Sequence, residues 1–329
     1  MIKRKIHHLS QAEGTLFTTN KMKSIIGKDG CSPGADEILL GTFKIPLNLL
    51  TPLQTQYFKN LQWENKIRPT GAPETININD IKEGFQKLKG KTSTSPSNRH
   101  PGHYKPLLAA DGKSGKVQNQ LSSETIWQII TTLINASITL STPLKRWQIV
   151  ESIFFEKEKG NSKINRLLII DNYEEDYNLL LKLYWPKITK NIAEKNNTLG
   201  EHQLRTRKRK ISTDASMIND FILDTTRICQ HTIVIQHNDT SVYYNRNIAN
   251  HASINSRREK TPKIVCNLQT NTLHSTNFYI QTSLGIFKES YSHQQNPIHG
   301  SGQGSRFAGN EFTFISVSII KTIEDTPIW

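Results

Sequence analysis

The stretch between residues 149 and 195 constrains the fold most, because it passes directly from a strand pattern to a helical pattern. It begins with "IVESIFFEKEKGNSKINRLLII", in which two apolar runs, 149–156 and 164–170, are joined by a basic turn containing Gly and Asn. This pattern is typical of a β-hairpin. Residues 174–195 then place apolar side chains at helical spacing, although Pro186 should kink or shorten that helix. The succession predicts an α+β fold.

Helical periodicity recurs on both sides of this stretch. Residues 123–140 show one apolar face, followed by Pro143, and are expected to form a core helix. Short helices are expected between residues 52 and 89, and an amphipathic helix is expected over 213–229. The apolar faces predicted for these helices comprise Ile126, Ile129, Ile130, Leu133, Ile134 and Ile138 in the first, Ile81, Phe85 and Leu88 in the second, and Ile218, Phe221, Ile222 and Thr225 in the third.

In the first 45 residues and in the last quarter of the chain, the sequence pattern predicts the secondary structure less clearly. Residues 1–45 lack sustained periodicity and are expected to be a poorly ordered lead-in. Segment 263–275 is ambiguous, and the β-branched content of 307–320 leaves helix and strand open. Between them, "NFYIQTSLGIFKESYS" predicts a hairpin that turns near residues 283–285.

The charge of the chain indicates its class of partner. The 42 Lys and Arg residues against 28 Asp and Glu give a formal net charge of +14, which suits nucleic acid and would also suit an anionic membrane surface. No stretch approaches the roughly 20 apolar residues of a membrane span. Cys31, Cys229 and Cys266 lie far apart, without the spacing of a disulfide framework or a zinc site.

An isolated acid at the end of an apolar run is the first candidate site. Residues 232–237 predict a strand, and Asp239 follows it. A carboxylate in that place can bind a divalent metal in two-metal chemistry. It can equally form an Asn-Asp turn by bonding to its own backbone. Tyr244, five residues on, fits a sugar-contacting aromatic or a core side chain.

Glycines and basic residues provide the other candidates. In "PIHGSGQGSRF", Gly300, Gly302 and Gly304 flank Gln303; such a loop lets backbone N–H groups approach a phosphate or a base pair, or is simply a flexible surface loop. Two basic segments, 91–105 and 205–210, could contact a nucleic-acid backbone or be solvated loops, and the second could also be a nuclear import signal. "DGKSGKV" at 111–117 lacks the Gly and the Ser or Thr of a phosphate-binding loop.

Taken in order, these motifs resemble the reverse transcriptases of non-LTR retroelements, particularly a group found in algae and protists. The similarity runs from about residue 50 to residue 321. It rests on "TSTSPSNRHPGHYKPLL", "NRLLII" with "EEDYNLLLKLYW", "HQLRTRKRKISTDA", "HNDTSVYYNR" and, most specifically, "YSHQQNPIHGSGQGS". The resemblance implies a right-hand polymerase, with fingers and a partial palm built on a ferredoxin-like sheet with helices. Its expected divisions are a lead-in at 1–45, a helical region with fingers at 46–229, and a partial palm at 230–329.

The resemblance also implies roles for single residues. Asp239 would be the catalytic carboxylate that binds Mg²⁺ or Mn²⁺, and Tyr244 would exclude a ribose 2′-hydroxyl. The loop beside the nascent base pair would be Gly302, Gln303 and Gly304, and the nucleotide-binding arginine of the fingers would be Arg166. The expected nucleic-acid contacts are Arg99, His103, Lys105, Arg207 and Arg209. The partners would be an RNA template, a DNA primer and a deoxynucleoside triphosphate, in RNA-directed DNA synthesis.

The chain also departs from the family pattern. Leu168 stands in place of a fingers arginine, and His237 and Asn245 replace acids on either side of Asp239. The family's second metal motif, an aromatic-x-Asp-Asp hairpin, does not follow the glycine loop, and Glu324 and Asp325 lack strand context. We therefore expect a C-terminally incomplete polymerase that is catalytically silent as given. The competing hypothesis is a non-catalytic nucleic-acid-binding remnant. An intracellular, nuclear location is expected from the "RKRK" run and the life cycle of retroelements.

Overall fold

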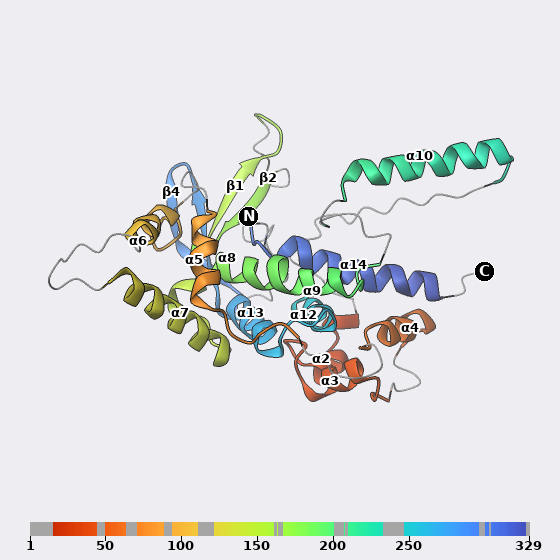
Figure 1. Ribbon diagram of the computed structural model, residues 1–329, viewed down its shortest axis with the longest axis horizontal. Coiled ribbons are helices and arrows are strands. Elements are labelled where there is room, and N and C mark those ends of the chain that lie inside the picture. The colour runs from red at the N-terminus through yellow and green to blue at the C-terminus, as the bar shows by residue number, and fades with distance from the viewer. Residues whose placement is uncertain are drawn as a thin grey trace.

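The structure is a computed structural model of a chain with mixed helical and strand content (Figure 1). In the described part of the chain the β-strands form one small sheet, and one end of this sheet packs on helices. The residues that the structure describes are 16–44, 50–63, 71–88, 94–110, 122–160, 163, 167–200, 207, 210–232, 247–295, 300–302 and 304–326. The α+β class predicted from the sequence is confirmed.

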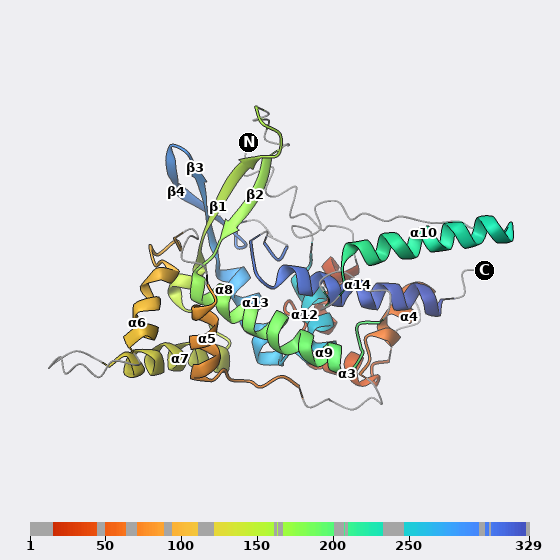
Figure 2. The same ribbon diagram turned by 45° about the horizontal axis from the view of Figure 1, so that its top comes forward.

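The sheet has four strands in the order β2-β1-β3-β4. Strands β1 (Ile149–Glu156) and β2 (Leu167–Asn172) form one antiparallel hairpin, and β3 (Asn277–Thr282) and β4 (Gly285–Ser292) form the other. The hairpins join through parallel pairing of β1 with β3, with Val150 opposite Phe278. Both hairpins extend away from the helices (Figures 1 and 2). Both hairpins predicted from the sequence are confirmed.

The main hydrophobic core lies where the bases of the strands meet the helices. Val150, Phe278 and Tyr291 from the sheet belong to the same buried cluster as Trp127 and Phe85 from the helices. The helices that supply buried members of this cluster are α5 (Ile78–Gln86), α7 (Ser123–Thr139), α8 (Glu175–Lys182), α9 (Lys190–Lys195), α13 (Lys263–Ser275) and α14 (Ala308–Asp325), together with the π-helical segment η6 (Leu183–Thr189) and the 3₁₀ turn η4 (Lys145–Gln148). Helix α6 (Lys105–Ala110), which follows the 3₁₀ turn η3 (Pro101–His103), packs against the cluster.

Helix α7 is present as predicted, but its buried face differs from the predicted one. Trp127, Ile134 and Ile138 are buried, whereas Ile129 and Leu133 are exposed. The prediction counted aliphatic residues and passed over the indole of Trp127, which packs near the ring of Phe85 at a centroid distance of 5.7 Å. The large aromatic side chain therefore determines which face of the helix is turned to the core.

Proline changes the helix that follows β2. Helix α8 continues into a π-helical segment, η6 (Leu183–Thr189), and then into α9 (Lys190–Lys195). Pro186 lies inside the π-helical segment and has no N–H to donate to the preceding turn. Wider π-type bonding accommodates the missing donor, so the predicted disturbance at Pro186 takes the form of a π-helical segment and not of a helix end.

Residues 16–44 form ordered elements, so the predicted lead-in is wrong for this part of the chain. The 3₁₀ turn η1 (Leu16–Thr18) precedes α2 (Asn20–Ile26) and α3 (Pro33–Leu40), which share a second buried cluster with α4 (Pro52–Asn60) and α12 (Ala249–Arg258). Thr19 and Ser32 accept hydrogen bonds as N-caps of α2 and α3, which stabilises helices this short.

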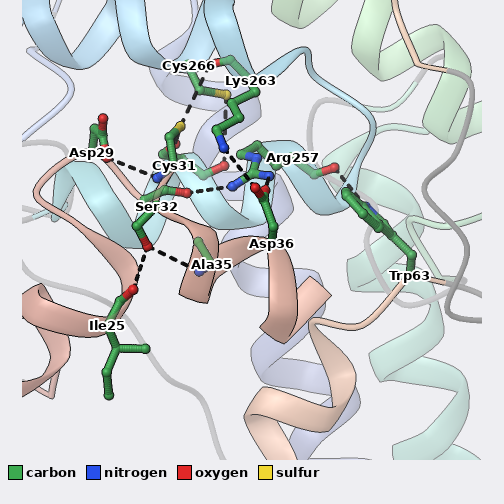
Figure 3. Close-up of polar contacts among 12 residues, drawn as sticks. Ile25, Asp29, Cys31, Ser32, Ala35, Asp36, Trp63, Arg257, Lys263 and Cys266 are labelled. Atoms are coloured by element: carbon green, nitrogen blue, oxygen red, sulfur yellow. Dashed lines mark hydrogen bonds and ion pairs between the residues drawn. The ribbon is translucent and has the colours of Figure 1, made fainter. Parts of the chain in front are cut away.

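A buried arginine ties this N-terminal part to α12 (Figure 3). The Arg257 guanidinium pairs with Asp36 of α3 and donates to the Gly30 carbonyl at 2.9 Å. Lys263 pairs with the same Asp36 carboxylate at 2.8 Å, and the Trp63 indole donates to the Arg257 carbonyl at 3.1 Å. The N-terminal segment that contains α3 is thus held in place by Arg257 and Lys263, which lie more than 200 residues away in the sequence.

The two undecided segments are both helices, α13 and α14. Residues 212–229 form the predicted amphipathic helix α10 (Ser212–Cys229). This helix stands apart from the rest (Figures 1 and 2), and Ile218, Phe221 and Ile222 on its predicted apolar face are exposed. In the described part of the chain, no helix is long and apolar enough to cross a membrane. The strand predicted at 232–237 falls almost wholly outside the described residues.

Candidate nucleic-acid interface

The glycine loop lies directly against the end of strand β2. At Gly302 (φ +70°) an added Cβ would lie 1.9 Å from the Tyr173 hydroxyl oxygen, and at Gly304 (φ +126°) it would lie 2.2 Å from the Asp171 carbonyl oxygen. Both positions combine a left-handed backbone with contacts too close for a side chain. The loop is therefore packed against the protein at these two residues, and glycine is required at each of them.

Hydrogen bonds fix the start of this loop to helix α14. The Gly300 amide donates to the Asn247 carbonyl at 2.6 Å, and the Asn247 side-chain amide donates to the Ser301 hydroxyl at 3.0 Å. The Ser301 hydroxyl in turn donates to the Glu311 carboxyl. Burial raises the pKa of Glu311 to about 8, against the opposing effect of the hydrogen bonds from Ser301 and Asn247. Glu311 is thus protonated in most molecules at neutral pH.

Beneath the loop, a polar chain crosses the sheet. Ser152 of β1 lies opposite Asp171 of β2 in the strand register and donates to its carboxylate at 2.7 Å. The Tyr291 hydroxyl of β4 lies 3.0 Å from the same Ser152 oxygen, and it acts as donor because the serine proton is already engaged. Burial raises the pKa of Asp171 to about 6, although the Ser152 hydrogen bond opposes the shift. Burial, and then the neighbouring Asp171, raise the pKa of Tyr173 well above its usual range.

The second motif segment, residues 94–105, is anchored at the start of helix α8. The Glu175 amide donates to the Ser95 hydroxyl at 3.0 Å, which satisfies one of the free N–H groups in the first turn of the helix. The Ser97 amide donates to the Glu174 carboxylate at 2.7 Å, and the Asn172 side chain donates to the Thr94 carbonyl at 2.9 Å. The base of this segment is therefore held to the junction of β2 and α8.

This anchoring leaves the predicted contact residues of the segment at the surface. Arg99, His103 and Lys105 are exposed. The His100 amide donates to Nδ1 of His103 at 3.2 Å, which favours a tautomer with the proton on the outer nitrogen, Nε2. Three side chains able to donate to phosphate oxygens thus project from an anchored base.

The two motif segments meet on one short stretch of chain. The glycine loop contacts Asp171 and Tyr173, and the 94–105 segment contacts Asn172, Glu174 and Glu175. Segments that lie some 200 residues apart in the sequence thus share residues 171–175 as their support.

Arg207 has partners within the protein. Its guanidinium pairs with Glu194 at 3.0 Å and donates to the Gly200 carbonyl, and its side chain is 11% exposed. A phosphate contact by Arg207 would require this ion pair to open, so the predicted role in nucleic-acid binding remains a prediction.

The other predicted site residues lie outside the described part of the chain: Asp239, Tyr244, Arg166, Gln303 and Arg209. Among the described residues, no group of three or more His, Cys, Asp or Glu side chains is arranged to hold a metal ion. The two carboxyl groups nearest the glycine loop, Asp171 and Glu311, are each engaged in hydrogen bonds to hydroxyl groups. Metal binding by Asp239 remains a prediction.

The residues of the site that no sequence motif contains as a predicted functional residue are Asp171, Ser152, Tyr173, Asn247 and Glu311. One signal was present for Glu311, which is a single acid within the apolar stretch 307–320. The sequence contains no such signal for Asp171, because an acid at the end of a strand is usually solvated. Comparison with known proteins adds no relative, since neither models of protein families nor curated proteins gave a match to this chain.

Proposed function

We propose that this chain is a reverse transcriptase-like protein of a non-LTR retroelement, which binds an RNA template and a DNA primer. The observation that supports this most is the shared attachment of the 94–105 segment and the glycine loop to residues 171–175. Both segments belong to motifs of the resemblance, and the one that contains the glycine loop is the most specific of them. A single interface formed by both is what a template-directed polymerase needs on one side of its nascent base pair.

In this proposal each segment has a distinct task. Arg99, His103 and Lys105 contact the sugar-phosphate backbone from an anchored base, and such contacts position a nucleic acid without reading its sequence. Gly302 and Gly304 let the loop pack closely against Tyr173 and Asp171, and this packing holds the loop beside the nascent base pair. Tyr244 and Arg166 contact the incoming deoxynucleotide, and Asp239 binds Mg²⁺ or Mn²⁺. We assign the β1–β2 hairpin to the fingers and residues 230–329 to a partial palm.

A primer-extension assay tests the proposal. The purified chain is given a primed RNA template, deoxynucleoside triphosphates and Mg²⁺, in parallel with an Asp239→Ala variant. Incorporation that is lost in the variant supports nucleotidyl transfer by this chain and would contradict the expectation that the chain is catalytically silent as given. Incorporation that survives in the variant contradicts the role of Asp239.

A second candidate is nucleic-acid binding without catalysis. Two observations favour it: the net charge of +14, and the engagement of the buried carboxyl groups of Asp171 and Glu311 by hydroxyl groups. It predicts no incorporation, together with RNA and DNA binding that weakens steeply with added salt. Absence of both incorporation and binding would contradict both candidates.

A further inference from the structure

Helix α7 has apolar side chains on two of its faces. Those on the inner face, Trp127, Ile134 and Ile138, belong to the main hydrophobic core. The Asn135 side chain fixes this orientation, because it donates to the Ile76 carbonyl at 2.8 Å and accepts from the Ile76 amide at 2.9 Å. The outer face carries a second apolar row, which we call the α7 seam: Ile126, Ile129, Leu133, Ala136 and Leu140.

The α7 seam is exposed and nearly without charge. Ile126 is half-buried, and the other members of the seam are exposed. Glu124, in the first turn, is the only charged residue of α7. A helix face that remains in water normally carries charged side chains, whereas a helix that is apolar on all sides is normally buried. The composition of α7 therefore favours a partner on its outer face.

The spacing within the α7 seam is that of a helix paired with another helix. Its members follow one another at intervals of three, four, three and four residues, which is the repeat by which two helices bury a common apolar line. The seam is about 21 Å long. Helix α7 packs on α5, α6 and α13 and lies at the border of the molecule in both views (Figures 1 and 2). A second helix can thus lie along the seam.

We propose that the α7 seam pairs with the α7 seam of a second copy of this chain, antiparallel and about a twofold axis. An axis that passes midway along the seam places Ile129 of one copy opposite Leu140 of the other. The same axis places Leu133 opposite Ala136, so that a large side chain meets a small one. The seam is self-complementary in this arrangement, as a twofold interface requires.

The charges at the two ends of the seam favour an antiparallel second copy. Glu124 lies at the N-terminal end, where it is exposed and pairs through Oε2 with Lys82 of α5 at 2.5 Å. Lys145 follows the C-terminal end, at the start of η4, and is also exposed. In the antiparallel dimer the acidic end of each seam lies beside the basic end of the other. A parallel pair would bring ends of like charge together, which opposes association.

Sedimentation velocity over about 1 to 100 µM chain measures this association. A single pair of helices of this length buries less than the roughly 1,200 Å² of stable interfaces. We therefore expect a monomer–dimer equilibrium with a dissociation constant on the order of 10 µM. The measurement uses the chain alone and does not depend on the proposed function.

One substitution in the middle of the seam tests the contact. Leu133→Glu should weaken dimerisation at least about tenfold, because the dimer would bury an unpaired carboxylate. Its thermal melt should stay close to that of the unaltered chain, because Leu133 is 44% exposed in the single chain. The matched control is Ile222→Glu, which adds the same charge to an apolar face of α10 at a residue that is 41% exposed. This control should dimerise like the unaltered chain.

An exchange of charges tests the antiparallel arrangement. Glu124→Lys and Lys145→Glu should each weaken dimerisation about three- to tenfold, because each places like charges at both ends of the paired seams. The double variant should return to within about threefold of the unaltered chain. Failure of the double variant to recover would overturn the antiparallel arrangement.

Three results would overturn the proposal as a whole. The first is a monomer over the entire concentration range. The second is dimerisation that Leu133→Glu leaves intact, and the third is an equal loss in Ile222→Glu, which indicates association through α10. A monomer that sediments with vesicles of phosphatidylserine and phosphatidylcholine, and loses this binding in Leu133→Glu, would assign the seam to a membrane surface and not to a second copy.

Discussion

Replacing Glu311 by glutamine should change how the stability of this protein depends on pH. Glu311 is 2% exposed, and its pKa rises from 4.5 to about 8 in the folded chain. Because folding raises this pKa, the folded chain holds the proton more tightly than the unfolded chain does. The resulting contribution to stability is complete below about pH 4.5 and is lost as the pH rises through about 8.

The size of the effect follows from one proton. A proton that is bound in the folded chain and released in the unfolded chain changes the free energy of unfolding by about 1.4 kcal/mol per pH unit. From about pH 5 to about pH 8, Glu311 therefore accounts for a fall of up to about 4 kcal/mol. Glutamine keeps the oxygen that accepts from Ser301 but does not titrate, so Glu311→Gln should remove this part of the fall.

Urea unfolding at several pH values between about 5 and 8 measures the difference. We expect Glu311→Gln to have about the same stability as the unaltered chain at the lower limit and to be more stable at the upper limit. Asp325→Asn is the control, because it removes the exposed last acid of the same helix; it should shift stability slightly, with little change in slope. Parallel pH profiles for Glu311→Gln and the unaltered chain would refute the reasoning.

Three further substitutions test the packing. Gly302→Ala should lower the free energy of unfolding by clearly more than Gly160→Ala. Both substitutions add a methyl group at positive φ, but the one at Gly302 would lie 1.9 Å from a tyrosine oxygen, whereas the one at Gly160 would have nothing within 4 Å. Equal free energies of unfolding for the two variants would contradict the contact. Asp176→Asn should lower the free energy of unfolding by about 3–5 kcal/mol, because the buried Asp176 carboxylate accepts a hydrogen bond from the Trp147 indole at 2.9 Å and pairs with Arg146. A melting temperature equal to that of the unaltered chain would disprove this. Ile134→Ala should lower the free energy of unfolding by about 2–5 kcal/mol. Ile222→Ala, on an exposed helix face, should change it by no more than about 0.5 kcal/mol. Comparable losses for the two variants in urea unfolding would show that α10 is buried in solution.

The hairpins could be predicted from the sequence because strand alternation and turn residues are local signals. Residues 149–170 and 277–292 contain their own pattern, and the structure confirms both hairpins. The helices between residues 16 and 44 could not be predicted this way. They are short and interrupted by glycines, and they are stabilised by a distant arginine, Arg257, that no local pattern reveals.

The candidate site also has some parts that the sequence predicts and others that depend on the three-dimensional fold. The glycine loop and the 94–105 segment have recognisable sequences, so their importance could be predicted. Their common support, residues 171–175, could not, because it depends on where a strand end and two loops meet in three dimensions. Asp171 resembles a solvated acid in the sequence, and only burial by distant segments distinguishes it. Glu311 is marked in the sequence only as the single acid of an apolar stretch, and its raised pKa comes from burial in the folded chain.

The central claim is that the 94–105 segment and the glycine loop form one nucleic-acid interface on residues 171–175. Amide hydrogen exchange with and without a primed RNA template tests it directly, since it reports protection along the backbone. We expect exchange to slow in both the 94–105 segment and residues 300–305 on addition of the template, while exchange in α10 is unchanged. Protection of only one of these segments, of neither, or chiefly of α10 would contradict it.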